Sequence, residues 1–453
     1  KRKQGLAGRL SYAYDGKYMA EVNMGYNGSE NFAKGHRWGF FPSIALGYNI
    51  SEESFFEPLR KVITSMKLRG SWGLVGNDQI GGERFIYMPT INLSGKGFTT
   101  GIDQNYGLSG PVYTRYENNS ITWEVGEKIN LGIDLQLLNS LNIVVDIFRE
   151  TRRDIFQKKG TIPTYLGTGN TDVFGNLAEM KNQGLDLSID YNKAFSKDFY
   201  MNFKGTFTYA HNEITKYDEA PKYAFQSKVG QSANVSQGYL SNGLFLDEAE
   251  IDRYNQQMGS TLGAGDIKYL NVSNMHGYGD DIVDVDDWTW IGNPTVPEIV
   301  YGFGPSFKYK NWDFSFFFQG VAKTSLFMSG FHPFGDNSLR NVLQFVANDR
   351  WSPTNQNVDA KYPRLTRKTS LNNTNPGNSG RTSDYWMRDG SFLKLKNMEL
   401  GYTFKRMRFY ISGSNLLTFS KFDLWDPEQG GGSGLKYPTQ RVFNVGFQMT
   451  FNN

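Results

Sequence analysis

The 453-residue sequence contains no cysteine, no long apolar run and almost no net charge. Without cysteine, neither disulfides nor thiolate metal sites are available. No stretch approaches the roughly 18 consecutive apolar residues of a membrane-spanning helix, which excludes insertion by helices. The 48 basic and 45 acidic residues leave a net charge of +3, too little to indicate nucleic-acid binding.

Aromatic residues and glycine are abundant. Aromatic side chains make up 15% of a sequence that is only 39% hydrophobic, and glycine occurs 50 times. A soluble globular domain seldom combines so many aromatics with so small an apolar fraction. A transmembrane β-barrel does, because aromatic girdles lie at both membrane interfaces while the lumen and loops stay polar. No signal peptide precedes the first predicted strand, so we expect a processed chain or part of a longer one.

The last segment, 441–451, alternates without a break. Phe443, Val445, Phe447, Met449 and Phe451 fall on one face and polar residues on the other. A two-residue period places successive side chains on opposite sides of a strand. Similar patterns predict thirteen strands, at 6–14, 17–26, 38–50, 65–75, 126–138, 141–150, 181–192, 199–210, 298–309, 312–320, 392–404, 407–419 and 441–451.

The connections between these strands are alternately short and long. Asp15-Gly16 is a strong two-residue hairpin signal. The longest of the short connections, 51–64, is expected to carry a helical turn. The pattern predicts an all-β fold, a transmembrane antiparallel β-barrel with short periplasmic turns and long extracellular loops. The long connections are 27–37, 76–125, 151–180, 211–297, 321–391 and 420–440.

Charged residues within the strands mostly take the polar face. A charge facing lipid at mid-bilayer costs about 2–4 kcal/mol, so the polar face is assigned to the lumen. Lys394 and Lys396 break the rule, since they share the parity of Met398 and Leu400. We expect them at the outer rim, either touching lipid phosphates or reaching into water. The charges that obey the rule are Glu21, Lys67, Arg69, Asp134, Asp146, Asp186, Asp190 and Lys204.

No catalytic constellation is visible, so the chain is not expected to be an enzyme, and no cofactor is implied. Asp186 and Asp190 resemble a glycosidase pair only if their alternation on a lumen face is ignored. The histidines show no metal-ligand spacing. They are His36, His211, His276 and His332.

Five tryptophans in or beside the long connections are the candidate ligand- or lid-contacting residues. Aromatic faces can stack on sugar rings or pack against peptide side chains. The alternative is that they pack the loops together or contact a partner protein. They are Trp288, Trp290, Trp351, Trp386 and Trp425.

Six segments of the chain form a recognisable series: Arg37–Phe56, Lys67–Asn77, Gly265–Tyr269, Tyr385–Phe404, Ile411–Phe419 and 437–451. In this order they resemble the SusC/RagA family of TonB-linked outer-membrane transporters of Bacteroidota. The resemblance spans nearly the whole chain, and it implies a 22-stranded barrel around an N-terminal plug. These 453 residues would then supply the C-terminal part of the barrel, strands 10 to 22. The plug, the TonB-contacting region and the first nine strands would be absent.

The resemblance also implies a function in the outer membrane of a Gram-negative bacterium. It implies TonB-dependent import of an oligosaccharide or an oligopeptide beneath a SusD-like lipoprotein lid, often in dimers of such pairs. Phe447 and Phe451 would form the membrane-insertion signal. Where the family often has a calcium loop, the 266–287 segment lacks the first carboxylates, so no metal site is expected. The alternatives are a siderophore or vitamin receptor and a non-transporting scaffold protein.

Overall fold

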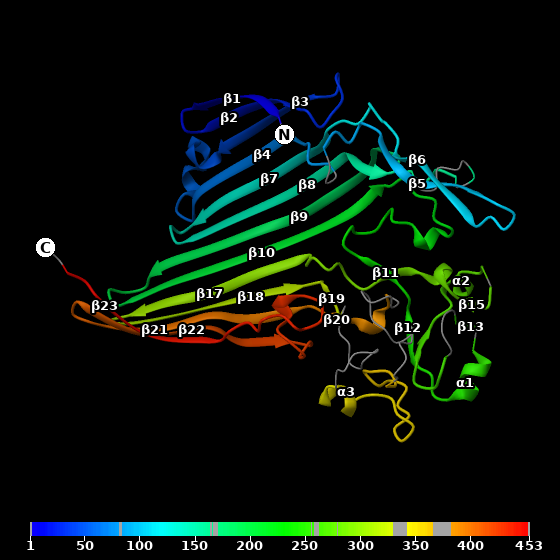
Figure 1. Cartoon of the computed structure of the whole chain (residues 1–453). Helices are drawn as coiled ribbons and strands as arrows, with labels where there is room; N and C mark the ends of the chain where they lie inside the picture. The colour runs from blue at the N-terminus through cyan, green and yellow to red at the C-terminus, as the bar shows by residue number, and fades with distance from the viewer. Residues whose placement is uncertain are drawn as a thin grey trace. The chain divides into compact units, whose positions relative to one another are not determined.

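The protein is described by a computed structural model, which covers residues 2–80, 84–163, 165, 171–254, 256–257, 262–278, 280–328, 342–365 and 382–451. Its main feature is a sheet of 13 strands, ordered in the sheet as they are in the chain (Figure 1). They are β1 (Lys3–Tyr14), β2 (Tyr18–Ser29), β3 (Trp38–Asn49), β4 (Ile63–Asn77), β7 (Glu124–Leu137), β8 (Leu141–Lys158), β9 (Phe174–Ala194), β10 (Phe199–Lys216), β17 (Ile299–Tyr309), β18 (Trp312–Ala322), β21 (Phe392–Phe404), β22 (Met407–Ser420) and β23 (Val442–Met449).

The thirteen predicted strands are all confirmed. β8, β9 and β10 continue well past their predicted limits, and each extends toward a long connection. The Asp15-Gly16 turn has the expected positive φ angles, 53° and 66°. The 51–64 connection contains the expected helical turns, η1 (Ile50–Glu52) and η2 (Ser54–Leu59).

The chain divides into two compact units. The first comprises Lys1–Asn192, Thr208–Pro221 and Ser227–Ala233. The second comprises Lys193–Phe207, Lys222–Gln226 and Asn234–Asn453. Each unit carries part of the sheet and a set of folded loops.

The apolar face of the sheet is exposed instead of packed. In the first unit, 63% of Leu131 in β7 is accessible, and its neighbours Ile129 and Ile133 are exposed with it. In the second unit, 88% of Val445 in β23 is accessible. An apolar surface of this extent is rare on a soluble monomer and is the expected outer face of a membrane barrel.

The opposite face of the sheet is polar and ion-paired. In the first unit, Arg69 on β4 contacts Asp134 on β7 at 2.8 Å and Asp146 on β8 at 3.0 Å. In the second unit, Arg408 on β22 pairs with Asp313 on β18 and contacts Glu399 on β21 at 2.6 Å. These groups follow the predicted parity.

The predicted surroundings of Lys394, lipid phosphates or water, are wrong, because β21 contains a bulge that turns this side chain to the polar face. Phe317 of β18 pairs with Asn397, whereas the next residue, Phe318, pairs with Leu395. Lys396 is therefore an extra residue, and one extra residue reverses the alternation of everything before it. Lys394 consequently shares the polar face of Asn397 and is completely buried. Lys396 is partly exposed, and the position of both residues at the outer rim stays a prediction.

The long connections fold into small cores of their own. In the first unit, the cluster Phe32, Ile80, Ile86, Ile121 and Trp123 joins the 27–37 and 76–125 connections. The 76–125 connection also contains a hairpin that the sequence reading missed, β5 (Thr90–Thr100) with β6 (Tyr106–Arg115). The larger core, in the second unit, is described next because it encloses two of the candidate tryptophans, Trp351 and Trp386.

Candidate functional site

The loops of the second unit form one packed body. Its buried residues come from three long connections, 211–297, 321–391 and 420–440. Short elements supply the scaffold: β11 (Ser236–Gly238) pairs with β16 (Thr289–Ile291), β12 (Ser241–Leu244) with β14 (Ile267–Tyr269), and β19 (Ser325–Phe327) with β20 (Met387–Asp389). The core residues are Tyr239, Leu244, Ile267, Tyr269, Val283, Leu326, Met328, Val346, Trp351, Ala360, Tyr362, Trp386 and Phe422.

Backbone hydrogen bonds tie the three connections to one another. Leu244 N–H donates to the Val358 carbonyl at 2.9 Å, which joins the first connection to the second. Gly432 N–H donates to the Phe327 carbonyl at 2.7 Å, which joins the second to the third. These bonds join the described parts of the three connections into one body.

A buried ion pair adds to this cross-linking. The Asp266 carboxylate is fully buried and accepts from the Arg364 guanidinium, Nε to Oδ1 at 2.5 Å and Nη2 to Oδ2 at 3.2 Å. This fork geometry satisfies both carboxylate oxygens, as a buried charge requires. Asp266 belongs to the Gly265–Tyr269 segment, so that segment has a structural part in the loop body.

Lys394 anchors the last long connection to the wall of the sheet. Its ammonium pairs with Asp426 and contacts Glu428 Oε2 at 2.8 Å, and Lys396 contacts Glu428 Oε1 at 2.7 Å. Burial acts to raise the pKa of Asp426, but the hydrogen bond and positive charge of Lys394, together with the Glu428 backbone N–H, lower it by more and leave the pKa below its ordinary value. The pKa of Glu428 is lowered in the same way, against burial, by Lys394 and Lys396.

The five candidate tryptophans lie in different environments. Trp386 is 0% exposed and Trp351 is 5% exposed, so both rings are enclosed by the loop core. Trp425 lies partly exposed at the edge of that core and donates through Nε1 to the Gly430 carbonyl at 3.0 Å. Trp290 is partly exposed in β16. Trp288 is 37% exposed and makes an edge contact with Tyr239, 6.0 Å between ring centroids.

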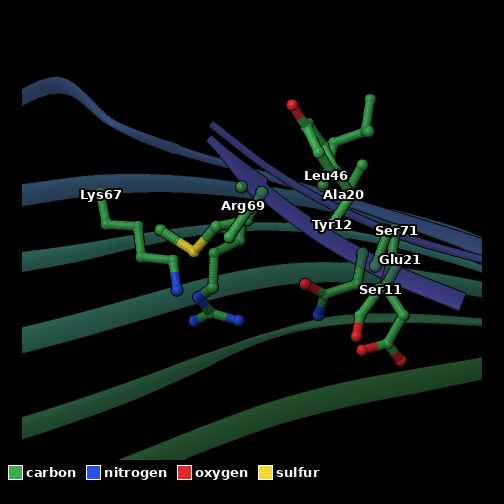
Figure 2. A pocket seen from close by; sticks show the side chains of 14 residues that line it. Ser11, Tyr12, Ala20, Glu21, Leu46, Lys67, Arg69 and Ser71 are labelled. Carbon is green, nitrogen blue, oxygen red and sulfur yellow. The ribbon is translucent and has the colours of Figure 1, made fainter. Parts of the chain in front are cut away.

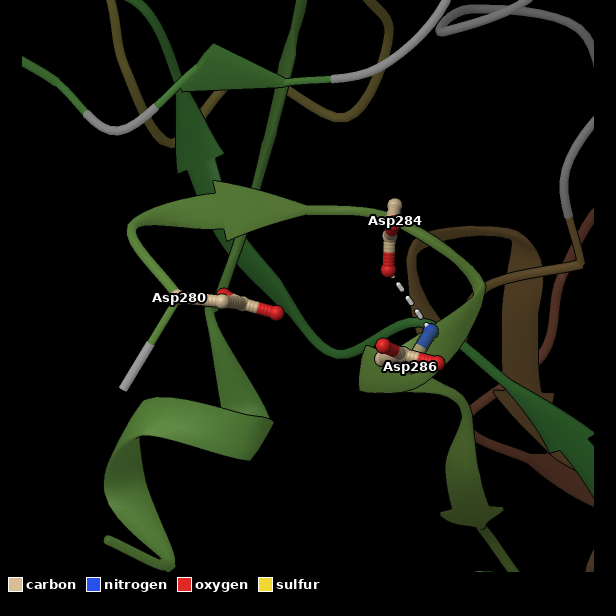
Figure 3. Close-up of side chains that lie close together, drawn as sticks. All are labelled: Asp280, Asp284 and Asp286. Atoms are coloured by element: carbon tan, nitrogen blue, oxygen red, sulfur yellow. Dashed lines mark hydrogen bonds between the residues drawn. The ribbon is translucent and has the colours of Figure 1, made fainter. Parts of the chain in front are cut away.

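The structure brings together three carboxylates in the 266–287 segment, Asp280, Asp284 and Asp286 (Figure 3). Their oxygens lie within 4.8 Å of one another. Each of the three carboxylates has a hydrogen-bond or ion-pair partner within the protein. Asp280 accepts from the backbone of Ile282 at 3.1 Å, Asp284 accepts from the backbone of Asp286 at 2.8 Å, and Asp286 pairs with Lys222.

Asp287, next to this cluster, is fully buried. Burial raises its pKa although backbone N–H groups of Ser273 and Asp284 donate to it. These hydrogen bonds fix the start of η5 (Val285–Asp287), so Asp287 has a structural part in the segment.

The polar wall of the first unit contains a hollow of about 540 Å³ (Figure 2). Lys67 and Arg69 extend from β4 to the same side of the sheet, where Glu21 and Ser71 also lie. Arg69 is already paired with two carboxylates, so the hollow offers polar groups of both signs with little unbalanced charge. Met19, Ala20 and Ala45 also line the hollow, so its surface is mixed in polarity.

The proposed insertion signal lies at the end of the sheet. Phe447 is exposed on the apolar face of β23, with its ring 5.1 Å from that of Phe409 on β22. Phe451 is exposed just beyond the strand. Among the described residues no helix is long and apolar enough to cross a membrane.

Sequence reasoning missed a group of aromatic rings in the 211–297 connection. Tyr223 and Phe225 stack against Tyr278 and His276. Tyr223 and Phe225 are two residues apart in the sequence, and so are His276 and Tyr278. This spacing is the sequence signal that could have indicated the group. His332 lies outside the described residues.

Comparison with known proteins gives a consistent result. A family model described as TonB-dependent receptor-like, β-barrel, matches residues 1–416. TonB-dependent receptor P3 of Formosa agariphila is 27% identical over 98% of this chain and 45% of its own length. TonB-dependent receptor SusC of Bacteroides thetaiotaomicron is 28% identical over 98% of this chain and 43% of its own length.

Solved structures agree on the fold. A structure of the RagAB peptide transporter superimposes with a TM-score of 0.72 at 20% identity, covering 99% of this chain and 48% of that one. The chain thus spans less than half the length of the relatives that it matches.

Proposed function

Because this chain belongs to the TonB-dependent receptor-like β-barrel family, we propose that it forms the C-terminal part of a SusC/RagA-type importer. Proteins of this family lie in the outer membrane of Gram-negative bacteria, and this chain belongs to that membrane. The cargo would be an oligosaccharide or an oligopeptide. Regions outside these residues would supply the plug and the contact with TonB.

One observation carries the proposal: the two faces of the sheet differ in polarity. One face exposes Leu131 and Val445, while the other carries the ion pairs of Arg69 and Arg408. A wall with an apolar outside and a polar inside can enclose a water-filled path through lipid. That arrangement suits a transporter of polar cargo.

The cross-linked loops of the second unit are evidence for a binding surface that a partner protein could cover. A body held together by the Asp266–Arg364 pair and a shared core presents a fixed surface rather than a set of independent loops. The RagAB importer has been solved in states named open-open and closed-closed. For the present protein we propose a SusD-like surface lipoprotein as the lid, with pairs that assemble as dimers.

Purification of the full-length protein from the outer membrane tests this function. We expect a surface lipoprotein to co-purify, and cells to take up labelled oligosaccharide or oligopeptide only while TonB is present. A matched strain lacking only the lipoprotein should lose uptake while keeping the barrel in the membrane. Uptake that persists without TonB would contradict the proposal.

A further inference from the structure

The aromatic group of the 211–297 connection has an upper layer, His276 and Tyr278, that packs on Tyr223 and Phe225. Tyr223 and Phe225 stack on each other, with 10° between the ring planes and 5.4 Å between the ring centroids. Tyr278 packs on Tyr223 at 4.3 Å with its ring tilted by 34°, and His276 stacks on Phe225 at 4.6 Å with 15° between the ring planes. Each upper ring therefore rests on another ring.

The upper layer is open to solvent. Tyr278 is 50% exposed, and His276 is exposed beside it. Both residues follow α2 (Val272–Met275), a short helix labelled in Figure 1, in which Val272 and Ser273 are buried. The two exposed rings are thus mounted on a buried base, and their planes are tilted relative to each other.

Hydrogen-bonding groups lie close to these rings. Lys222 Nζ lies 5.2 Å from the centre of the Tyr223 ring and pairs with Asp286. Gln226 donates to the backbone carbonyl of Asp286 at 3.0 Å, which fixes the two segments side by side. The site therefore offers ring faces next to a donor and an acceptor.

We propose that these four rings, edged by Lys222 and Asp286, are a carbohydrate-binding subsite; the proposal rests on the importer function above. Sugar rings have apolar C–H faces that pack on aromatic rings and hydroxyl groups at their edges that exchange hydrogen bonds with such polar groups. The two upper rings provide the packing surface, and the ion pair provides partners for the hydroxyls.

The backbone beneath the rings favours a sugar over a peptide strand. The N–H groups of 276–278 already donate within the turn: His276 to Val272 at 3.2 Å, Gly277 to Asn274 at 2.9 Å and Tyr278 to Ser273 at 3.0 Å. A peptide that binds as an added strand needs free main-chain partners. A ligand recognised through ring faces does not.

Substitution of the upper layer tests the subsite in the full-length protein. The probe is an array of neutral and acidic oligosaccharides, followed by titration of the strongest binder. Double substitution H276A with Y278A removes the packing surface and should weaken that binder at least tenfold. The single variant Tyr278→Trp keeps an aromatic ring at this position and should retain most of the affinity of the unsubstituted protein. Tyr437→Ala removes an exposed tyrosine from another loop and should change affinity less than twofold.

Three results would overturn the subsite. The first is that the unsubstituted protein binds no oligosaccharide on the array. The second is that the double variant binds with unchanged affinity. The third is that the double variant loses its co-purifying lipoprotein but keeps its affinity for the glycan. TonB-dependent uptake of peptides alone would remove the subsite and leave the importer function standing. Loss of all TonB-dependent uptake in the unsubstituted protein would remove both.

Discussion

Lys394, on the wall of the sheet, holds Glu428 of the last long connection at 2.8 Å while its own side chain is almost completely buried. The same ammonium pairs with Asp426. The final loop is therefore fastened to the polar face by one lysine with two carboxylates.

Lys394→Met should release this loop. The substitution leaves two partly buried carboxylates without their main partner, and removal of one member of a buried pair costs about 3 kcal/mol or more. Limited proteolysis of the full-length protein should show new cleavage within 420–440. Lys361→Met, at an exposed lysine, should leave the cleavage pattern unchanged. Equal resistance in both variants would contradict the role of Lys394.

Acidification should loosen the same loop. The pKa values of Asp426 and Glu428 are lowered in the folded state, so both groups stay ionised there at pH values where the released loop would take up protons. Their contribution is present above the ordinary carboxyl pKa of about 4 and is lost as the pH falls through the lowered values.

A fluorophore on Ser433→Cys would report this loosening, since these 453 residues contain no other cysteine to label. Cysteines elsewhere in the full-length protein would be replaced first. The signal should change below about pH 4, and the change should disappear in the Lys394→Met background. A transition of equal size in that background would assign it to other groups.

A side chain at Gly132 should disturb the ion pair on the polar face. A Cβ at this position would lie 2.5 Å from Asp146 Oδ1 and 2.8 Å from Arg69 Cζ, so both side chains must shift in Gly132→Ala. Because these atoms are the ends of flexible side chains, we expect a loss of about 1 kcal/mol or less, the usual contribution of a partly exposed ion pair. Gly70→Ala is the matched control, since its Cβ would meet only Leu131 at 3.5 Å. Urea titration of the folded barrel, followed by gel mobility, compares the two.

A charge on the apolar face should obstruct assembly. Leu131→Arg places a guanidinium toward lipid, at a cost of about 2–4 kcal/mol near mid-bilayer. Asn130→Arg, one residue earlier on the opposite face, should assemble normally. The measurement is the yield of heat-modifiable barrel in the outer membrane. Similar yields for the two variants would contradict the assignment of the faces.

The strands could be predicted from the sequence because alternation is a local property. Residues 129–137 show it without any knowledge of their neighbours, and the strand β7 follows. The surroundings of Lys394 could not be predicted in this way. A bulge at Lys396 depends on how β21 pairs with β18, and alternation alone does not reveal the pairing.

The environments of the tryptophans could not be predicted from the sequence either. Trp351 and Trp386 come from one long connection but are buried by residues of two others, including Tyr269 and Phe422. Long-range packing of this kind leaves no periodic trace in the sequence. The aromatic subsite has one local signal in the sequence, the two-residue spacing of Tyr223 and Phe225. The sequence does not show that His276 and Tyr278 pack against these two rings.

Spin-label accessibility along β7 tests the central claim most directly. Single cysteines at each position from 129 to 135, labelled in the full-length protein reconstituted in lipid, report contact with oxygen dissolved in lipid or with a water-soluble nickel complex. The account predicts a two-residue alternation, with oxygen dominant at 129, 131, 133 and 135 and nickel dominant at 130, 132 and 134. Uniform protection from both reagents at the odd positions would place them in a protein core and contradict the account.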